Sequence, residues 1–164
     1  MSLYYQYYSS PLGRLTLLAS EQYLHGVFFE QHRHHDSDPN WKLSHGHPLL
    51  EQTQLQLQEY FCGERIAFDL PLQPNRGTQF QQQVWQALRQ IPYAKTTSYG
   101  ALAQSIGNPK AVRALGAANG RNPFSIIVPC HRVIAANGDL HGYAGGLDKK
   151  QYLLDLERRV SKMI

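Results

Sequence analysis

Short apolar runs separated by polar breaks dominate the first part of the chain. Residues 3–8, 15–19 and 24–29 form three such runs, and Pro11 and Gly13 mark a turn between the first two. Runs of this length, closely spaced and bounded by turn residues, are typical of antiparallel strands. The pattern therefore predicts a three-stranded meander near the N-terminus.

Two further segments complete this half of the chain. Residues 48–61 place Leu50, Leu57 and Phe61 near one face, which predicts an amphipathic helix. Residues 66–70 are apolar enough to be a candidate for a further strand. The first half is therefore predicted to be a small sheet with one helix.

Histidine is concentrated in residues 31–47, which are otherwise polar and are predicted to form a loop. These histidines have no regular ligand spacing and no cysteine beside them, which argues against a zinc site. We therefore assign no metal to the chain. The histidines concerned are His32, His34, His35, His45 and His47.

The second half is predicted to be mostly helical. Thr78 can cap a helix that carries Trp85 and Leu88 on its apolar face. Pro92 marks the end of this helix, because the residue before a proline is biased away from the helical conformation. Residues 148–160 have the apolar spacing of a final helix.

Between these two helices the sequence predicts a pair of short helices. The first is capped by Thr97 or Ser98 and stops at Gly107. The second begins at Asn108 and Pro109, since asparagine suits the N-cap and proline the first helical position. Two short helices joined by a glycine-containing turn are typical of a helix-turn-helix, with two ordinary packed helices as the alternative.

Together these elements predict an α+β fold with two domains. A small N-terminal domain of antiparallel strands and a helix spans residues 1–75. A mostly helical C-terminal domain, which contains the helix-turn-helix, spans residues 76–164. The prolines and the glycine of residues 71–77 are typical of a linker between the two domains.

Charge divides the chain in a similar way. Residues 1–84 hold five Lys/Arg and eight Asp/Glu, whereas residues 85–164 hold eleven Lys/Arg and four Asp/Glu. No acidic residue lies between Asp69 and Asp139. Such a basic stretch indicates a face that binds a polyanion, with nucleic acid as the first candidate, or else an ordinary solvated surface.

The composition argues against two other classes of protein. No stretch approaches the ~20 consecutive apolar residues of a membrane-spanning helix, and the N-terminus lacks the pattern of a signal peptide. Two cysteines without an export signal indicate a reducing compartment. We therefore expect a cytoplasmic protein that does not associate with membranes.

The densest chemistry lies in residues 126–133, where an apolar, β-branched run meets Pro129, Cys130, His131 and Arg132. The run predicts a buried strand that the proline ends, which places the cysteine on the following turn, held in position but reachable. Neighbouring histidine and arginine side chains favour the reactive thiolate. The alternative is a buried thiol beside an incidental imidazole, because free cysteine is among the most buried residue types.

This run resembles the active-site signature of the O6-alkylguanine-DNA alkyltransferases, the methylated-DNA–protein-cysteine methyltransferases. The resemblance is dense over residues 76–160, whereas residues 1–75 match only in general character. Several blocks occur in the order expected for this family, and such a series is highly specific. The blocks are residues 80–88, 91–100, 107–116, 122–123 followed by 129–133, 142–147 and 150–157.

The resemblance implies a catalytic group of four residues. Cys130 would accept the alkyl group from O6 of guanine, and His131 would remove the thiol proton through a water molecule. Glu157 would orient the histidine, as the third member of an activated-nucleophile arrangement. Considered alone, it is also consistent with a solvated charge at a helix end. Asn122 would tether the turn that supports the active-site backbone.

The resemblance also implies the residues that handle DNA, because the target base must leave the duplex to be reached. Arg113 would enter the base stack, Tyr99 would assist flipping and contact the base, and Lys110 would act as a point charge. A surface cation and a partly buried aromatic are the alternatives for the first two. The residues expected to line the substrate pocket are Val133, Tyr143 and Ala144.

The chain departs from the family pattern at two positions. Ala94 stands where glycine is frequent, which leaves the conformation of that turn open. Ala144 stands where several relatives carry serine, which can alter the size of the pocket and its tolerance of larger alkyl groups. No cysteine matches the N-terminal zinc ligands of some relatives, in agreement with the assignment of no metal.

The expected function is single-turnover DNA repair by a monomer without a cofactor. The alkyl group of O6-alkylguanine, and of O4-alkylthymine, in double-stranded DNA would pass to Cys130, and the thioether has no easy leaving group. The alternatives are a non-repairing protein that binds alkylated DNA, a methylation-sensing regulator and a cysteine hydrolase. The cysteine argues against the first, the expected lack of an extra metal-binding domain against the second, and the basic stretch against the third.

Overall fold

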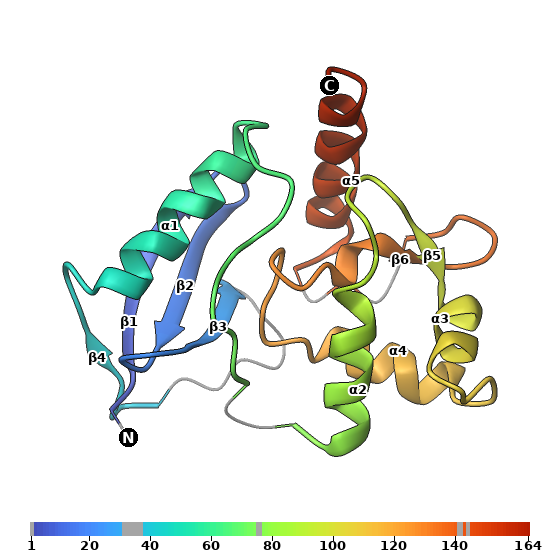
Figure 1. Cartoon of the computed structure of the whole chain (residues 1–164), viewed down its shortest axis with the longest axis horizontal. Coiled ribbons are helices and arrows are strands. Elements are labelled where there is room, and N and C mark those ends of the chain that lie inside the picture. The colour runs from blue at the N-terminus through green and yellow to red at the C-terminus, as the bar shows by residue number, and fades with distance from the viewer. Residues whose placement is uncertain (1, 31–37, 75–76, 141–142, 144) are drawn as a thin grey trace. The chain divides into compact units, whose positions relative to one another are not determined.

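The computed structural model describes residues 2–30, 38–74, 77–140, 143 and 145–164. The chain divides into two compact units (Figure 1). The short segment Pro123–Ile127 belongs with the N-terminal unit, although it lies well inside the second half of the sequence. Unit 1 consists of Met1–Asn75 and Pro123–Ile127, and unit 2 consists of Arg76–Asn122 and Val128–Ile164.

Unit 1 is built on a four-stranded sheet in the order β3-β2-β1-β4. The strands β1 (Tyr4–Ser10), β2 (Gly13–Ala19) and β3 (Leu24–Phe29) pair antiparallel in sequence order, so the predicted meander is confirmed. A two-residue strand, β4 (Lys42–Leu43), pairs parallel with β1. It lies inside a segment that the sequence predicts to be a loop, because two residues are too few to produce a period.

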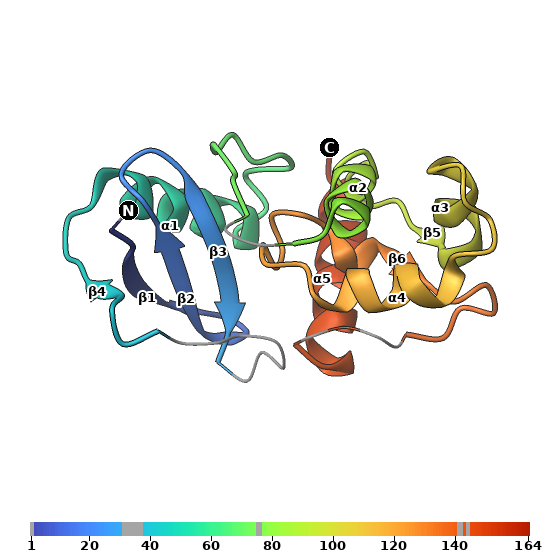
Figure 2. The ribbon, with the colours of Figure 1, turned by 90° about the horizontal axis from the view of Figure 1, so that it is seen from below.

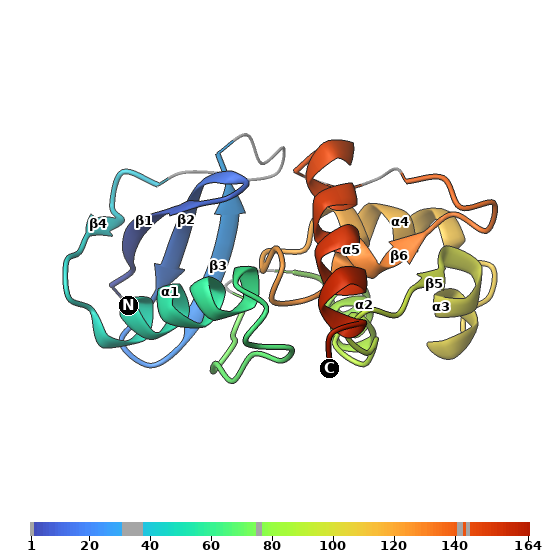
Figure 3. The ribbon, with the colours of Figure 1, turned by 90° about the horizontal axis from the view of Figure 1, so that it is seen from above.

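One helix, α1 (Pro48–Phe61), packs against β1 and β2 and covers one face of the sheet (Figures 1 and 3). Its bounds are those predicted, and Leu50 and Leu57 are completely buried. His47 caps the helix, since its Nδ1 accepts a hydrogen bond from the Leu49 backbone N–H at 3.2 Å. One histidine of the polar segment therefore has a structural role.

The rest of the histidine-rich segment adds little to this picture. His32, His34 and His35 lie outside the described residues, and His45 is exposed. Within the described part of the chain, no three His, Cys, Asp or Glu side chains are grouped as metal ligands.

The free edge of β3 is covered by segments from elsewhere in unit 1. Leu24 forms a parallel bridge with Leu72, and Val27 forms one with Phe124 (Figure 2 shows β3 at this end of the sheet). These bridges satisfy backbone groups that an open sheet edge would leave unpaired. Residues 66–70 form no strand, so the candidate strand at that position is wrong.

The apolar run before Cys130 is not a strand either, which corrects the prediction for residues 126–128. Ile126 has φ +74°, in the left-handed region, and the Ile127 backbone N–H donates to the Ser125 carbonyl at 2.8 Å. The run is nevertheless buried. A short apolar run does not distinguish a buried turn from a buried strand, because both place every side chain in the core.

Unit 2 begins with α2 (Gln79–Leu88), whose first turn is closed by a capping box. The Thr78 hydroxyl accepts from the Gln81 N–H at 3.1 Å, and the Gln81 side chain accepts from the Thr78 N–H at 2.9 Å. Trp85 links α2 to the later helix that contains Ala118, since its Nε1 donates to the Ala118 carbonyl at 2.9 Å. The cap predicted at Thr78 is therefore confirmed.

Two short helices follow, α3 (Tyr99–Ser105) and α4 (Val112–Gly120), and α4 packs against both α2 and α3 (Figure 2). Ser98 caps α3 as predicted, and Gly107 takes φ +76° in the connection. However, α4 begins three residues later than Pro109, the predicted first position. Lys110 therefore lies in the connecting turn and not on the helix, which corrects its placement.

The remaining elements of unit 2 surround Cys130. The 3₁₀ helix η1 (Cys130–Arg132) runs into β6 (Val133–Ile134), which pairs parallel with β5 (Thr97–Ser98). The last helix, α5 (Leu147–Ser161), which Figure 3 labels, packs against η1. None of the described helices is long and apolar enough to cross a membrane.

The capping box predicts a measurable effect on stability. Replacing Thr78 with Ala should lower the free energy of unfolding by about 1 kcal/mol, because the Gln81 N–H loses its acceptor. Urea unfolding followed by circular dichroism measures this change. Thr78→Ser keeps the hydroxyl and should cost much less; equal losses in the two variants would show that the cap is not the cause.

Candidate active site

Cys130 is buried at the start of η1, with 3% of its surface exposed. Its backbone is held on both sides: its N–H donates to the Val128 carbonyl at 2.8 Å, and Asn119 Nδ2 donates to its carbonyl at 3.4 Å. The sequence suggests a thiol that solvent can reach, and the structure corrects this. The sulfur is therefore shielded from solvent in this structure.

Burial also dominates the electrostatics of this thiol. Loss of hydration raises the pKa of Cys130 from 9.0 to about 11, although a hydrogen bond with the Asn122 side chain and the charge of Lys150 act in the opposite direction. The thiol is therefore protonated at neutral pH, and a base must take its proton before the sulfur can react. The neighbouring histidine and arginine do not generate a thiolate in advance, contrary to the expectation from the sequence.

His131 is completely buried, and its Nε2 lies 2.7 Å from Oε2 of Glu157. An ionised carboxylate can only accept, so Nε2 carries a proton and donates it to this bond. Burial lowers the pKa of His131, which leaves the ring neutral and makes Nδ1 the acceptor. Nδ1 makes no hydrogen bond to any part of the chain that the structure describes.

Glu157 projects from α5 and is buried as well. Arg132 donates to it twice, from Nε to Oε1 at 2.8 Å and from Nη2 to Oε2 at 2.9 Å. The Ala94 backbone N–H also donates to Oε1, at 3.1 Å. Burial alone would raise the pKa of Glu157, but the hydrogen bonds and charges of His131 and Arg132 hold it well below its usual range.

The turn at Ala94 is the one whose conformation the sequence leaves open. Ala94 has φ +63°, in the left-handed region that non-glycine residues rarely adopt. This conformation aims its N–H at Glu157. The chain therefore keeps the turn with alanine, and the hydrogen bond to a buried carboxylate offsets the backbone strain.

Lys150 supplies a further cation close to the thiol. It is fully buried, and its Nζ donates to the Val133 carbonyl at 2.6 Å. Desolvation lowers the pKa of Lys150 to about 8, although the proximity of Cys130 acts to raise it. At neutral pH its positive charge opposes the effect of burial on the cysteine.

Two tyrosines border the thiol as neutral phenols. Burial, and then the proximity of Cys130, raise the pKa of both Tyr99 and Tyr143. The Tyr143 ring also lies edge-on to the His131 ring, with 6.5 Å between centroids. Asn122 lies beneath the turn that precedes the cysteine and donates from Nδ2 to the Val128 carbonyl at 2.8 Å.

Comparisons with known proteins match both halves of the chain. Residues 3–74 match the family model described as 6-O-methylguanine DNA methyltransferase, ribonuclease-like domain, and residues 79–159 match the model of its DNA binding domain. A methylated-DNA–protein-cysteine methyltransferase of Methanosarcina acetivorans is 48% identical, over 94% of this chain and 98% of that protein. A Haemophilus influenzae protein of the same description is 45% identical, over 96% and 87%. The chain belongs to the methylated-DNA–protein-cysteine methyltransferase family.

A solved structure gives the same result for the fold. The crystal structure of Mycobacterium tuberculosis OGT in complex with DNA has a TM-score of 0.90 and 45% sequence identity. The match covers 96% of this chain and 94% of that one. The predicted fold, a small sheet domain followed by a mostly helical domain, is therefore confirmed for this methyltransferase.

Two of the residues expected to handle DNA lie at the surface of unit 2, whereas the third, Tyr99, is buried at the start of α3. Arg113 is exposed in the first turn of α4, and Lys110 is exposed in the turn before it. Arg132, from the same acid-free stretch, is instead buried against Glu157 and cannot meet a phosphate. Of the residues expected to line the pocket, Val133 and Tyr143 are buried near Cys130, while Ala144 lies outside the described residues.

Sequence reasoning misses the burial and the partners of two cations of this methyltransferase site, Arg132 and Lys150. The sequence does contain a hint of both, since Arg132 directly follows His131 and Lys150 lies about two helical turns before Glu157 on α5. However, lysine and arginine are almost never fully buried unless they are paired. The sequence therefore favours a surface position for each, and only the fold reveals the carboxylate and carbonyl that hold them.

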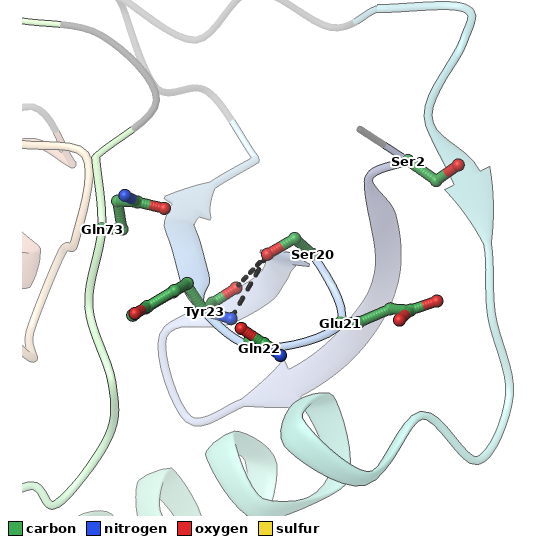
Figure 4. Close-up of a pocket in the computed structure, with 6 residues that line it drawn as sticks. All are labelled: Ser2, Ser20, Glu21, Gln22, Tyr23 and Gln73. Carbon is green, nitrogen blue, oxygen red and sulfur yellow. Dashed lines mark hydrogen bonds between the residues drawn. The ribbon is translucent and has the colours of Figure 1, made fainter.

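A pocket in unit 1 is separate from this chemistry (Figure 4). It has a volume of about 370 Å³ and is lined by serine, glutamine, glutamate and tyrosine side chains. Ser20 Oγ accepts from the Tyr23 backbone N–H at 3.3 Å and lies 2.9 Å from His25 Nε2, so its hydroxyl is committed to internal bonds. The lining residues are Ser2, Ser20, Glu21, Gln22, Tyr23 and Gln73.

The left-handed turn predicts a stabilising substitution. Ala94→Gly removes the steric strain but keeps the N–H that Glu157 needs, so the free energy of unfolding should rise by up to about 1 kcal/mol. Urea unfolding measures it. Ala87→Gly, in the regular helix α2, is the matched control and should instead cost about 1 kcal/mol. A loss of stability in both variants would show that Ala94 is unstrained.

Proposed function

We propose that this protein repairs DNA by moving the alkyl group of O6-alkylguanine to Cys130, once per protein molecule. The supporting observation is the way Glu157 holds His131, the residue that follows the buried Cys130. Its Nε2 is committed to an ionised Glu157, so Nδ1 is left as the base. Family membership supplies the reaction, and this geometry supplies a way to perform it.

The reaction begins with loss of the thiol proton. His131 takes it at Nδ1, through a bridging water, and Glu157 stabilises the imidazolium that forms. The sulfur then attacks the alkyl carbon, so that an S–C bond forms while the C–O6 bond breaks. Guanine leaves with the electron pair and is reprotonated. No step restores the thiol, because a thioether carbon has no good leaving group, so one protein repairs one base.

Double-stranded DNA is the partner in this proposal. The target O6 lies within the base stack, so the nucleotide must rotate out before Cys130 can reach it. We assign Arg113 to the space that the base leaves, Tyr99 to the flipped nucleotide, and Lys110 to the phosphates. The O4 atom of alkylthymine presents the same alkyl ether chemistry and is a second substrate.

Three other functions are less well supported. A protein that only binds alkylated DNA needs neither a nucleophile nor a base held in one orientation, whereas this chain has Cys130 and, next to it in sequence, a histidine whose ring Glu157 holds through Nε2. A methylation-sensing regulator would add a metal site, and the described residues contain no cluster of metal ligands. A cysteine hydrolase needs a substrate other than DNA, which the basic stretch and the family disfavour.

A cytoplasmic location fits the state of the two cysteines. Cys62 and Cys130 are both free in the structure. A free nucleophilic thiol persists in a reducing compartment and is at risk of oxidation elsewhere. We therefore place the protein, as a monomer, in the compartment that also holds the DNA.

The identity of the acceptor is tested by mass spectrometry. After incubation with a duplex containing one O6-methylguanine, the intact protein should gain one methyl group, and peptide mapping should find it on Cys130. Cys130→Ala should gain none while still binding DNA. Cys62→Ala is the matched control and should react as the wild type does. Methyl transfer by the Cys130→Ala protein would refute the proposal.

The role of Arg113 is tested by comparing two substrates. O6-benzylguanine as a free base needs no flipping, so Arg113→Ala should react with it normally and react with the alkylated duplex more slowly, by about tenfold or more for the lost flipping contact. Lys110→Ala should instead weaken DNA affinity and reduce the salt dependence of binding. Equal losses of Arg113→Ala on both substrates would place this residue in the fold or the pocket.

A further inference from the structure

Arg132 is a buried cation within the catalytic group. Its guanidinium meets both oxygens of Glu157, at 2.8 Å and 2.9 Å, and its Nη1 donates to the Ile91 carbonyl at 2.8 Å. Only 9% of its side chain is exposed. The two parallel N–H groups match the two carboxylate oxygens, so this fork fixes both the position and the rotation of the carboxylate.

The fork also alters the charge that His131 faces. A lone carboxylate beside a histidine favours the imidazolium and raises the pKa of the ring. The positive charge of Arg132 sits against the same carboxylate and acts on His131 in the opposite direction. Without Arg132, the negative charge of Glu157 would be uncompensated and would raise the pKa of His131 against the effect of burial.

Other ionisable groups face the same ring. Lys150 lies on α5, as Glu157 does, and its charge also disfavours a second positive charge on His131. Cys130 precedes the histidine on η1, and the Tyr143 ring approaches it edge-on. The cysteine and the tyrosine are uncharged at neutral pH, so Glu157, Arg132 and Lys150 set the charge around the imidazole.

We propose that Arg132 is a positioning residue that balances the charge of Glu157 and so keeps His131 neutral, ready to accept the Cys130 proton. The inference rests on the proposed transfer to Cys130 and adds one requirement to it. An imidazolium has no lone pair, so a histidine that is charged before the reaction cannot serve as the base. The carboxylate still orients the ring and stabilises the imidazolium once the proton has moved.

The test is the pH dependence of alkyl transfer in Arg132→Gln. The free base O6-benzylguanine is the substrate, so that DNA binding does not contribute, and intact-protein mass spectrometry follows the rate. Transfer needs neutral His131, so the rate rises as pH increases through the pKa of that ring. Loss of the cation should move this midpoint upward by about one pH unit or more. At pH values below both midpoints the rate should be lower than that of the wild type by about tenfold for a shift of one pH unit, and the two rates should converge in alkaline solution.

Arg132→Lys separates charge from geometry. Lysine keeps a cation but has no fork. This variant should therefore retain the wild-type midpoint and be slower by about tenfold at every pH, as a displaced base would be. Arg158→Gln is the matched control, because Arg158 is exposed on α5, the helix that carries Glu157, and pairs with Asp155. It should keep both the rate and the midpoint of the wild type.

Three results would overturn the proposal. A rate that falls by the same factor at all pH values in Arg132→Gln would show a purely structural role. Removing one partner of a buried ion pair can prevent folding; if that occurs, Arg132→Lys carries the test. In Arg132→Lys, a wild-type rate would show that the paired N–H groups of the arginine are not needed. A raised midpoint in Arg132→Lys would show that the retained positive charge does not keep His131 neutral.

These outcomes differ from a failure of the proposed function itself. If Cys130 is not the acceptor, the wild-type protein carries no alkyl group there at any pH. If only the role of Arg132 is wrong, the wild-type protein transfers normally and the variants alone behave differently from expectation.

Discussion

The burial of Glu157 is the constraint on which the active site of unit 2 depends. A buried carboxylate without partners would be prohibitively costly in its ionised form, because it loses its hydration. Here it accepts from His131, from both branches of the Arg132 fork and from the Ala94 N–H. The partners lie on η1 and on the turn before β5, so one side chain of α5 joins three segments that are distant in sequence.

Stability alone does not account for this arrangement. Desolvation of a buried ion pair often cancels its attraction, and well-packed apolar side chains can be as stable in its place. The strained backbone at Ala94 adds a further cost. What an apolar cluster cannot do is fix the protonation state and orientation of a histidine. The charges are therefore better explained by proton transfer from Cys130 than by folding.

Local signals in the sequence predict most of the regular elements. The helix Pro48–Phe61, the strand Leu24–Phe29 and the caps at Thr78 and Ser98 follow from periodicity and from hydrogen bonding within a few residues. Errors occur where distant contacts decide. The run before Cys130 is a buried turn because residues beside it pair with β3, and α4 starts late because the chain turns through Lys110 first.

The residues of the active site also fall into those that the sequence predicts and those that it does not. The sequence run Pro129–Arg132 singles out Cys130 and His131, and the family resemblance adds Glu157, which the fold brings to His131. The conformation of Ala94 and the burial of Arg132 and Lys150 are different, because each is set by a partner more than ten positions away. Propensity and motif carry no information about such partners. The parts of the site that adjust charge were therefore the parts that sequence reasoning did not find.

A protein that is consumed by a single reaction gains from a nucleophile that stays inert until its substrate arrives. Oxidants and small electrophiles attack the thiolate, so a Cys130 thiol with a pKa of about 11 is protected from them at neutral pH. The same high pKa would prevent repair if no base were present to remove the thiol proton. In the proposed mechanism, a neutral His131, oriented by Glu157 and kept uncharged by the nearby cations, resolves this conflict, because it can remove the proton as the sulfur attacks the alkyl carbon.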